Sequence, residues 1–123
     1  MNEPQSMDGA LEIRRGETHG KTVVLRVRGR IDAKTAPRLL QSVQPFAGMG
    51  RSLVLNLAEV TFMGPSGVGV LLAVTQAFQD HSGSARLAAP PAAVVSVVSL
   101  LNLEPFLKID ATEDEALPAM AGR

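Results

Sequence analysis

The tetrapeptide Gly64-Pro65-Ser66-Gly67 places one hydroxyl between two apolar stretches of different periodicity. Residues 53–57 before it are apolar at nearly every position, which is typical of a strand buried on both faces. After it, apolar residues recur at a spacing that suits one face of a helix: Val68, Val70, Leu71, Val74 and Phe78. A helix start directs free backbone N–H groups and a positive dipole end outward. The sequence therefore predicts that Ser66 is a place for a phosphate.

Enzyme interpretations of this tetrapeptide are weaker. Continued by Val68, it resembles the G-x-S-x-G pattern of serine hydrolases, but Val68 stands where that pattern has its second glycine. Neither His19 nor His81 has an evident acidic partner for a catalytic triad. The loop also lacks the Lys-Ser or Lys-Thr of a nucleotide-binding phosphate loop. We expect no catalytic residue and no bound cofactor, and a small enzyme or nucleotide-binding protein is a distant alternative.

The helix start at Ser66 and the stretch that ends at Asp32 each have a structural as well as a functional interpretation. Ser66 could be simply the N-cap of its helix. Gly67 and Gly69 in the first turn each lower helix propensity by about 1 kcal/mol relative to Ala, which favours a close approach of a partner to the backbone. Asp32 ends the stretch Gly29-Arg30-Ile31-Asp32, where a turn or capping role is the simplest interpretation.

Composition bounds the class of protein. The chain has 123 residues, which suits a single domain, and we expect a flexible N-terminus at 1–9, a domain at 10–118 and a tail at 119–123. Twelve basic and twelve acidic residues give a formal net charge of zero, and aromatic residues make up only 3%. Neither a basic footprint nor a base-stacking surface is present, so we expect no nucleic-acid binding.

Metal, disulfide and membrane chemistry are also not expected. The chain has no cysteine, and its two histidines, His19 and His81, lie far apart in polar stretches, so we expect solvated loop residues and no metal site. No apolar run approaches the roughly 18 residues of a membrane span, and the N-terminus lacks the pattern of a signal peptide. The expected location is the cytoplasm.

The periodicities predict an α/β domain in which strands and helices alternate. Strands are expected at 11–14, 21–28, 53–57, 86–88 and 107–109. Helices are expected from about 35 to 48, where Pro45 and Gly48 end the helix, from 66 to about 80, where Gly83 is a stop, and from 94 to 101, with a short terminal helix after 112. The 94–101 segment also suits a strand because it is rich in valine. This alternation indicates right-handed crossovers, with the first two strands paired as a hairpin at one edge.

Together, four segments resemble the STAS domain, and more narrowly the bacterial anti-sigma factor antagonists. They are Gly29-Arg30-Ile31-Asp32, Leu53-Val54-Leu55-Asn56-Leu57, Val60-Thr61-Phe62-Met63 and Ser66-Gly67-Val68-Gly69-Val70-Leu71. The similarity runs from about Leu11 to Leu117. It implies a single domain with a small mixed central sheet and helices packed mainly on one side. It also implies a partner, an anti-sigma factor with serine kinase activity, which the unphosphorylated antagonist captures. Phosphorylation of one serine ends the capture, and a phosphatase restores it.

The resemblance assigns roles residue by residue. Ser66 matches the phosphorylated serine, and the residues matched to the partner surface are Asp32, Met63, Gly64, Pro65, Gly67 and Val68. The family's usual Asp-Ser-Ser-Gly is here Gly64-Pro65-Ser66-Gly67, so an acidic residue and an adjacent hydroxyl are replaced. The alternative is therefore a STAS module that phosphorylation does not switch: a constitutive binder, a scaffold or a subunit of a transport complex.

Overall fold

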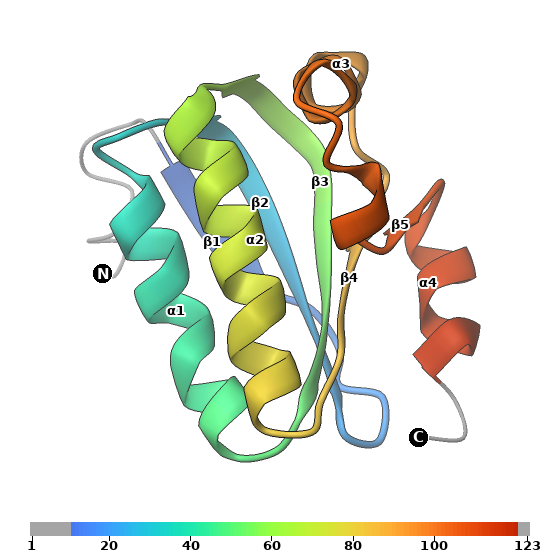
Figure 1. Cartoon of the computed structure of the whole chain (residues 1–123). Helices are drawn as coiled ribbons and strands as arrows, with labels where there is room; N and C mark the ends of the chain where they lie inside the picture. The colour runs from blue at the N-terminus through green and yellow to red at the C-terminus, as the bar shows by residue number, and fades with distance from the viewer. Residues whose placement is uncertain (1–10, 121–123) are drawn as a thin grey trace.

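A computed structural model describes residues 11–120 and shows one sheet flanked by helices (Figure 1). The strands are β1 Leu11–Arg15, β2 Thr22–Ile31, β3 Ser52–Met63, β4 Ala85–Ala88 and β5 Ile109–Asp110. The helices are α1 Ala36–Gly48, α2 Pro65–Asp80, α3 Ala92–Leu100, the 3₁₀-helix η2 Glu104–Phe106 and α4 Glu113–Met120. The predicted order is confirmed, including a helix for the valine-rich segment. The predicted flexible segment at 1–9 and residues 121–123 of the predicted tail lie outside the described residues.

The five strands lie in the order β1-β2-β3-β4-β5. Only the β1–β2 pair is antiparallel, as the predicted hairpin requires, and the other three pairs are parallel. Each parallel connection contains a helix, and crossovers of one hand place successive helices on the same face of the sheet. Figure 1 shows α1 and α2 side by side over that face, whereas α4 lies at the far edge. The predicted fold class, a mixed sheet with helices mainly on one side, is confirmed.

Two clusters of buried side chains stabilise the layers. The larger cluster lies between the sheet and helices α1, α2 and α3, and it includes Val23, Leu25, Leu55, Leu71 and Phe78. The smaller cluster lies on the other face, beneath α4, and consists of Val24, Val54, Ala88 and Ala116. Successive residues of a strand point to opposite faces, so β2 and β3 contribute to both clusters. None of the helices within residues 11–120 covers the rest of the second sheet face, over β1 and the later parts of β2 and β3.

Strand β3 extends beyond the predicted residues 53–57, because two irregularities in its pairing with β2 interrupt the alternation of buried and exposed residues. In the β2–β3 pair, the register shifts between Arg26 and Arg28 and again between Gly29 and Arg30. Each shift inserts one extra residue in β3, so its buried side chains after Leu57 are Val60 and Met63. This spacing of three conceals a strand from a search for alternation, and it reorients the last residues of β3 at the sheet edge.

The predicted helix ends at Gly48 and about Asp80 are confirmed, but two residues near them have other roles than predicted. Pro45 lies inside α1, which continues to Gly48, although proline removes one backbone hydrogen bond. After α2, the left-handed residue is Ser82, with φ of 66°, rather than Gly83. Gly83 is required for another reason: a Cβ there would lie 2.3 Å from the carbonyl oxygen of Arg51.

Candidate functional site

The loops that follow β2 and β3 meet at one edge of the sheet. Arg30 pairs with Phe62 and Ile31 with Met63 in the parallel register, so the two strands end side by side. The backbone N–H of Gly64 donates a hydrogen bond of 3.0 Å to the carbonyl oxygen of Ile31. Asp32 and Ser66, the two functional candidates of the sequence, therefore lie at the same carboxyl-end edge, where α/β sheets commonly bind ligands.

Ser66 lies in the first turn of α2 and is exposed. Gly64 is the N-cap residue, with extended backbone (φ −92°, ψ −179°), and Pro65 occupies the first helical position. The interpretation of Ser66 as the N-cap is therefore wrong by two residues. Its hydroxyl makes no hydrogen bond with any described residue, and no side chain caps this helix. A free hydroxyl beside the positive end of the dipole is a suitable acceptor for a phosphoryl group.

The two glycines of the first turn have different environments. A Cβ on Gly67 would lie 2.8 Å from both the Ile31 carbonyl oxygen and the Met63 side chain, so glycine is needed for α2 to pack on the strand ends. A Cβ on Gly69 would have nothing within 4 Å, and Gly69 is exposed. Internal packing accounts for Gly67. Only Gly69 leaves backbone open to a close approach from outside.

Asp32 forms the turn between β2 and α1. Its Oδ1 accepts hydrogen bonds from the N–H groups of Lys34 (3.0 Å) and Thr35 (3.2 Å). Its carbonyl oxygen accepts from Ala36, and the Thr35 hydroxyl donates to the Arg30 carbonyl (2.8 Å). Desolvation by burial acts to raise the pKa of the Asp32 carboxyl, but the N–H groups of Thr35 and Lys34, the Thr35 hydroxyl and Arg30 together lower it. The turn interpretation is supported, and the side chain remains 28% exposed.

Sequence reasoning missed an exposed cation–aromatic pair beside this turn. The guanidinium of Arg30 lies over the ring of Phe62, 4.2 Å from its centroid, and its Nε lies 3.5 Å from Oδ2 of Asp32. Phe62 is 40% exposed, and its ring edge would lie 3.4 Å from a Cβ on Gly64. The signal was present, since Phe62 is one of only four aromatic residues and lies four positions before Ser66. The parallel register that joins it to Arg30 was not visible.

The residues matched to the partner surface divide into two groups. Met63 and Val68 are 4% and 2% exposed and pack in the main core, and Gly64 and Gly67 are also buried. Their side chains or backbones support the loop from beneath. The exposed surface at this edge, which we name the carboxyl-edge surface, consists of Arg30, Asp32, Phe62, Pro65, Ser66 and Gly69.

Other sites for chemistry are few in the described part of the chain. No group of three histidine or acidic side chains in residues 11–120 is arranged to hold a metal ion. His81 directly follows α2, and its ring Nδ1 lies 3.1 Å from the carbonyl oxygen of Ala77. The Nε2 of His19 lies 3.9 Å from Oε1 of Glu17. Within residues 11–120, the helices are too short or too polar to cross a lipid bilayer.

The described residues thus form a five-stranded mixed sheet, with Ser66 at the start of the helix that follows its central strand. The family model of the STAS domain matches residues 15–116. The chain therefore belongs to the STAS domain family.

Three relatives illustrate the family. The "Anti-sigma F factor antagonist" of Lysinibacillus sphaericus is 28% identical over 104 residues, which cover 83% of this chain and 88% of the relative. A crystal structure of an anti-sigma factor antagonist from Mycobacterium paratuberculosis is 27% identical, with a TM-score of 0.79 over 90% of this chain and 94% of that one. The Bacillus cell fate determinant SpoIIAA in its phosphorylated form has a TM-score of 0.67 at 23% identity, over 88% and 98% of the two chains, which shows the shared fold.

Proposed function

We propose that this chain is an anti-sigma factor antagonist, a protein-binding regulator that captures an anti-sigma factor with serine kinase activity. The free, exposed hydroxyl of Ser66 in the first turn of α2 carries the proposal. The names of the relatives support it, since they are called antagonists of anti-sigma factors. The capture surface is the carboxyl-edge surface, which surrounds Ser66 with one aromatic ring, one proline and a paired Arg30 and Asp32.

Phosphorylation of Ser66 ends the capture. The Ser66 Oγ attacks the γ-phosphorus of ATP bound by the kinase partner, the bond to ADP breaks, and the hydroxyl proton passes to a base of the kinase. The product carries a charge of roughly −1.5 to −2 at pH 7. The positive end of the α2 dipole stabilises this phosphate within the protein, whereas the docked partner must desolvate it. A phosphatase restores the hydroxyl and the capture.

The replacement of the family's Asp by Gly64 affects the start of the helix. Gly64 has negative φ and extended ψ, so a residue with a side chain fits there, and a Cβ would make an ordinary contact with Phe62 at 3.4 Å. An aspartate at this N-cap position would accept hydrogen bonds from the first turn and lie close to the Ser66 hydroxyl. The natural chain has no such carboxylate beside the acceptor. We therefore expect phosphoryl transfer to Ser66 to be slow, which prolongs the capturing state.

Mass spectrometry after incubation with the cognate anti-sigma kinase and ATP tests the proposal. The expected result is a single phosphate on Ser66, absent in Ser66→Ala and present in the control Ser96→Ala, which changes an exposed serine on α3. Single-turnover rates should be higher in the double variant Gly64→Asp, Pro65→Ser, because proton-transfer assistance is typically worth about 10²–10⁴-fold. Phosphate on neither protein, with capture intact, would favour a STAS module that phosphorylation does not switch.

A further inference from the structure

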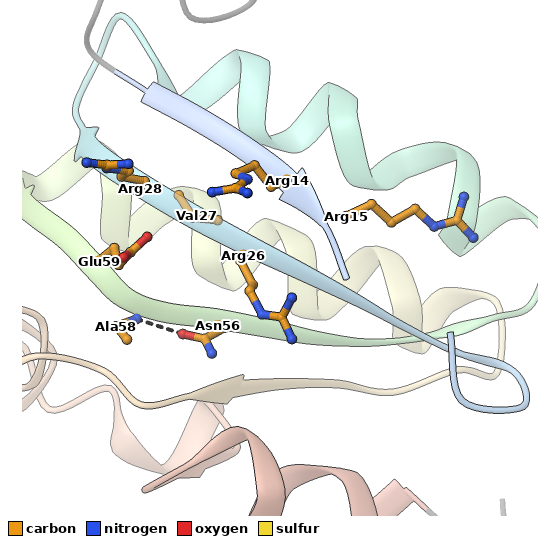
Figure 2. Close-up of a pocket in the computed structure, with 8 residues that line it drawn as sticks. All are labelled: Arg14, Arg15, Arg26, Val27, Arg28, Asn56, Ala58 and Glu59. Atoms are coloured by element: carbon orange, nitrogen blue, oxygen red, sulfur yellow. Dashed lines mark hydrogen bonds between the residues drawn. The ribbon is translucent and has the colours of Figure 1, made fainter. Parts of the chain in front are cut away.

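A hollow lined by arginines lies on the second sheet face, mainly opposite the face that carries α1, α2 and α3 (Figure 2). It has a volume of about 360 Å³. It lies over β1, β2 and β3, and its lining residues are Arg14, Arg15, Arg26, Val27, Arg28, Asn56, Ala58 and Glu59. Four of the eight are arginines and one is acidic, in a chain with no net charge.

The strand register brings like charges together in this hollow. Arg14 on β1 lies directly opposite Arg26 on β2 in the antiparallel pair. Like charges in this position destabilise a sheet, so the arrangement is not explained by folding stability. Arg26 is partly neutralised by Glu113 of α4, which accepts hydrogen bonds from its Nη2 (2.8 Å) and Nε (3.1 Å).

Two of the arginines keep their charge without a partner. Arg14 and Arg28 form no ion pair or hydrogen bond through their side chains with any described residue. Glu12 and Glu59 are the cross-strand neighbours of Arg28, but neither comes within 4.0 Å as an ion pair, and Glu12 does not line the hollow. Figure 2 shows Arg14, Arg26 and Arg28 over the same part of the sheet, whereas the side chain of Arg15 extends away from them.

The floor of the hollow is held in place by hydrogen bonds. Asn56 accepts from the N–H of Ala58 through Oδ1 (2.8 Å) and donates from Nδ2 to Glu113 (3.0 Å). One extra residue of β3 between Asn56 and Glu59 forms a β-bulge in the hollow, and bulges are common next to active sites. The guanidinium groups are therefore presented from a rigid surface, which lowers the entropic cost of binding.

We propose that this hollow binds a small anion of the phosphoryl type, for which pyrophosphate is the probe. Guanidinium groups match phosphoryl oxygens with two parallel hydrogen bonds, and Arg14 and Arg28 offer two such groups on neighbouring strands. The hollow suits a compact anion because it is concave and has no aromatic residue for a nucleobase. This site is separate from the proposed capture function, and Ser66 has no part in it.

Isothermal titration calorimetry with pyrophosphate tests the proposal on the whole chain at about 0.15 M salt, where charges more than about 8 Å apart are largely screened. Arg14→Gln and Arg28→Gln should each weaken binding about tenfold or more, as expected for loss of a charge-assisted hydrogen bond. Arg15→Gln is the matched control, because it removes the same charge from the adjacent residue, whose guanidinium lies over Phe46. Its effect should be less than about twofold, since its guanidinium lies over Phe46 of α1 and is not directed at the bound anion. Glu113→Gln should tighten binding, because it releases Arg26.

The midpoint of thermal unfolding serves as the control that each variant is folded. Arg14→Gln should leave it unchanged or raise it, since the variant removes a like-charge pair. The proposal would be overturned if millimolar pyrophosphate gave neither binding heat nor a shift in the thermal midpoint. An equal loss of affinity in Arg15→Gln and Arg14→Gln would also overturn it. Binding of a hexaglutamate peptide or of vesicles with phosphorylated lipid headgroups, without binding of free pyrophosphate, would also overturn it, since the face would then serve an acidic protein or a membrane.

Discussion

At the scale of single residues, the exposure of Ser66 follows from its neighbours in the first turn of α2. Pro65 needs no hydrogen-bond acceptor at the first helical position, and Gly67 packs without a side chain against Ile31 and Met63. With these residues fixed, the hydroxyl of Ser66 faces away from the core. The position of Ser66 at a helix start could be predicted from the sequence, because a strand, a turn and a helix start each leave a local pattern. The sequence did not predict that Gly64 is the cap.

Asp32 combines two roles that a pair of substitutions separates. Asp32→Asn keeps an oxygen at Oδ1 for the N–H groups of Lys34 and Thr35 but removes the charge that faces Arg30. We expect its thermal midpoint to stay close to that of the natural protein, whereas Asp32→Ala should lower it by several degrees because the turn loses its acceptor.

Affinity for the anti-sigma factor then reports on the charge. If the carboxylate contacts the partner, Asp32→Asn should weaken binding about tenfold at unchanged stability, measured by calorimetry and thermal unfolding. Normal affinity in Asp32→Asn would make Asp32 a turn residue alone.

At the scale of elements, the packing of α2 on the strand ends positions the carboxyl-edge surface. Gly67→Ala should destabilise the protein by about 1–3 kcal/mol, because the new Cβ would lie 2.8 Å from the backbone oxygen of Ile31. Gly69→Ala has open space around it and should stabilise the protein by about 0.5–1 kcal/mol through helix propensity. Chemical denaturation measures both changes. Equal effects of the two substitutions would show that α2 does not depend on this close approach.

Local sequence patterns predicted the strands and helices well. The features that they missed depend on the strand register, that is, on which residues of neighbouring strands lie opposite each other. The valine-rich segment is α3, as its length indicated, and the order of strands and helices is as predicted. The strand predicted at 53–57 is only the first half of β3, because the bulges after Asn56 break the alternation of buried residues. The pairing of Arg30 with Phe62, and of Arg14 with Arg26, depends on which residues of two strands lie opposite each other. No single strand contains that information.

At the scale of the whole molecule, α4 covers part of the second sheet face through one charged side chain, Glu113, and a cluster of four small buried residues. Glu113 accepts hydrogen bonds from Arg26 and Asn56, and its side chain is 20% exposed. The side-chain hydrogen bond from Arg26 lowers the pKa of Glu113, with a further contribution from Asn56, although desolvation opposes the shift. The ionised carboxylate thus stabilises the folded state, by about 1 kcal/mol or less because Arg26 is half exposed.

The pH dependence of stability tests this contact. A lowered pKa in the folded state means that the contribution is complete above the ordinary pKa of glutamate, about 4.3, and is lost as pH falls through the lowered value. The free energy of unfolding of Glu113→Gln should therefore lie below that of the natural protein at neutral pH and converge with it in acid. Glu115→Gln, in the same first turn of α4 but exposed, is the control. A constant difference at all pH values would contradict the account.

Capture and release are a property of the whole complex, and one comparison tests them most directly. The dissociation constant for the cognate anti-sigma factor is measured with unphosphorylated protein and with protein fully phosphorylated on Ser66, with Ser66→Ala and Ser96→Asp as controls. We expect the unphosphorylated protein, Ser66→Ala and Ser96→Asp to bind equally, and the phosphorylated protein to bind at least about tenfold more weakly, because a doubly charged group must be desolvated at the docked surface. Equal affinity of the phosphorylated and unphosphorylated proteins would contradict the proposed switch.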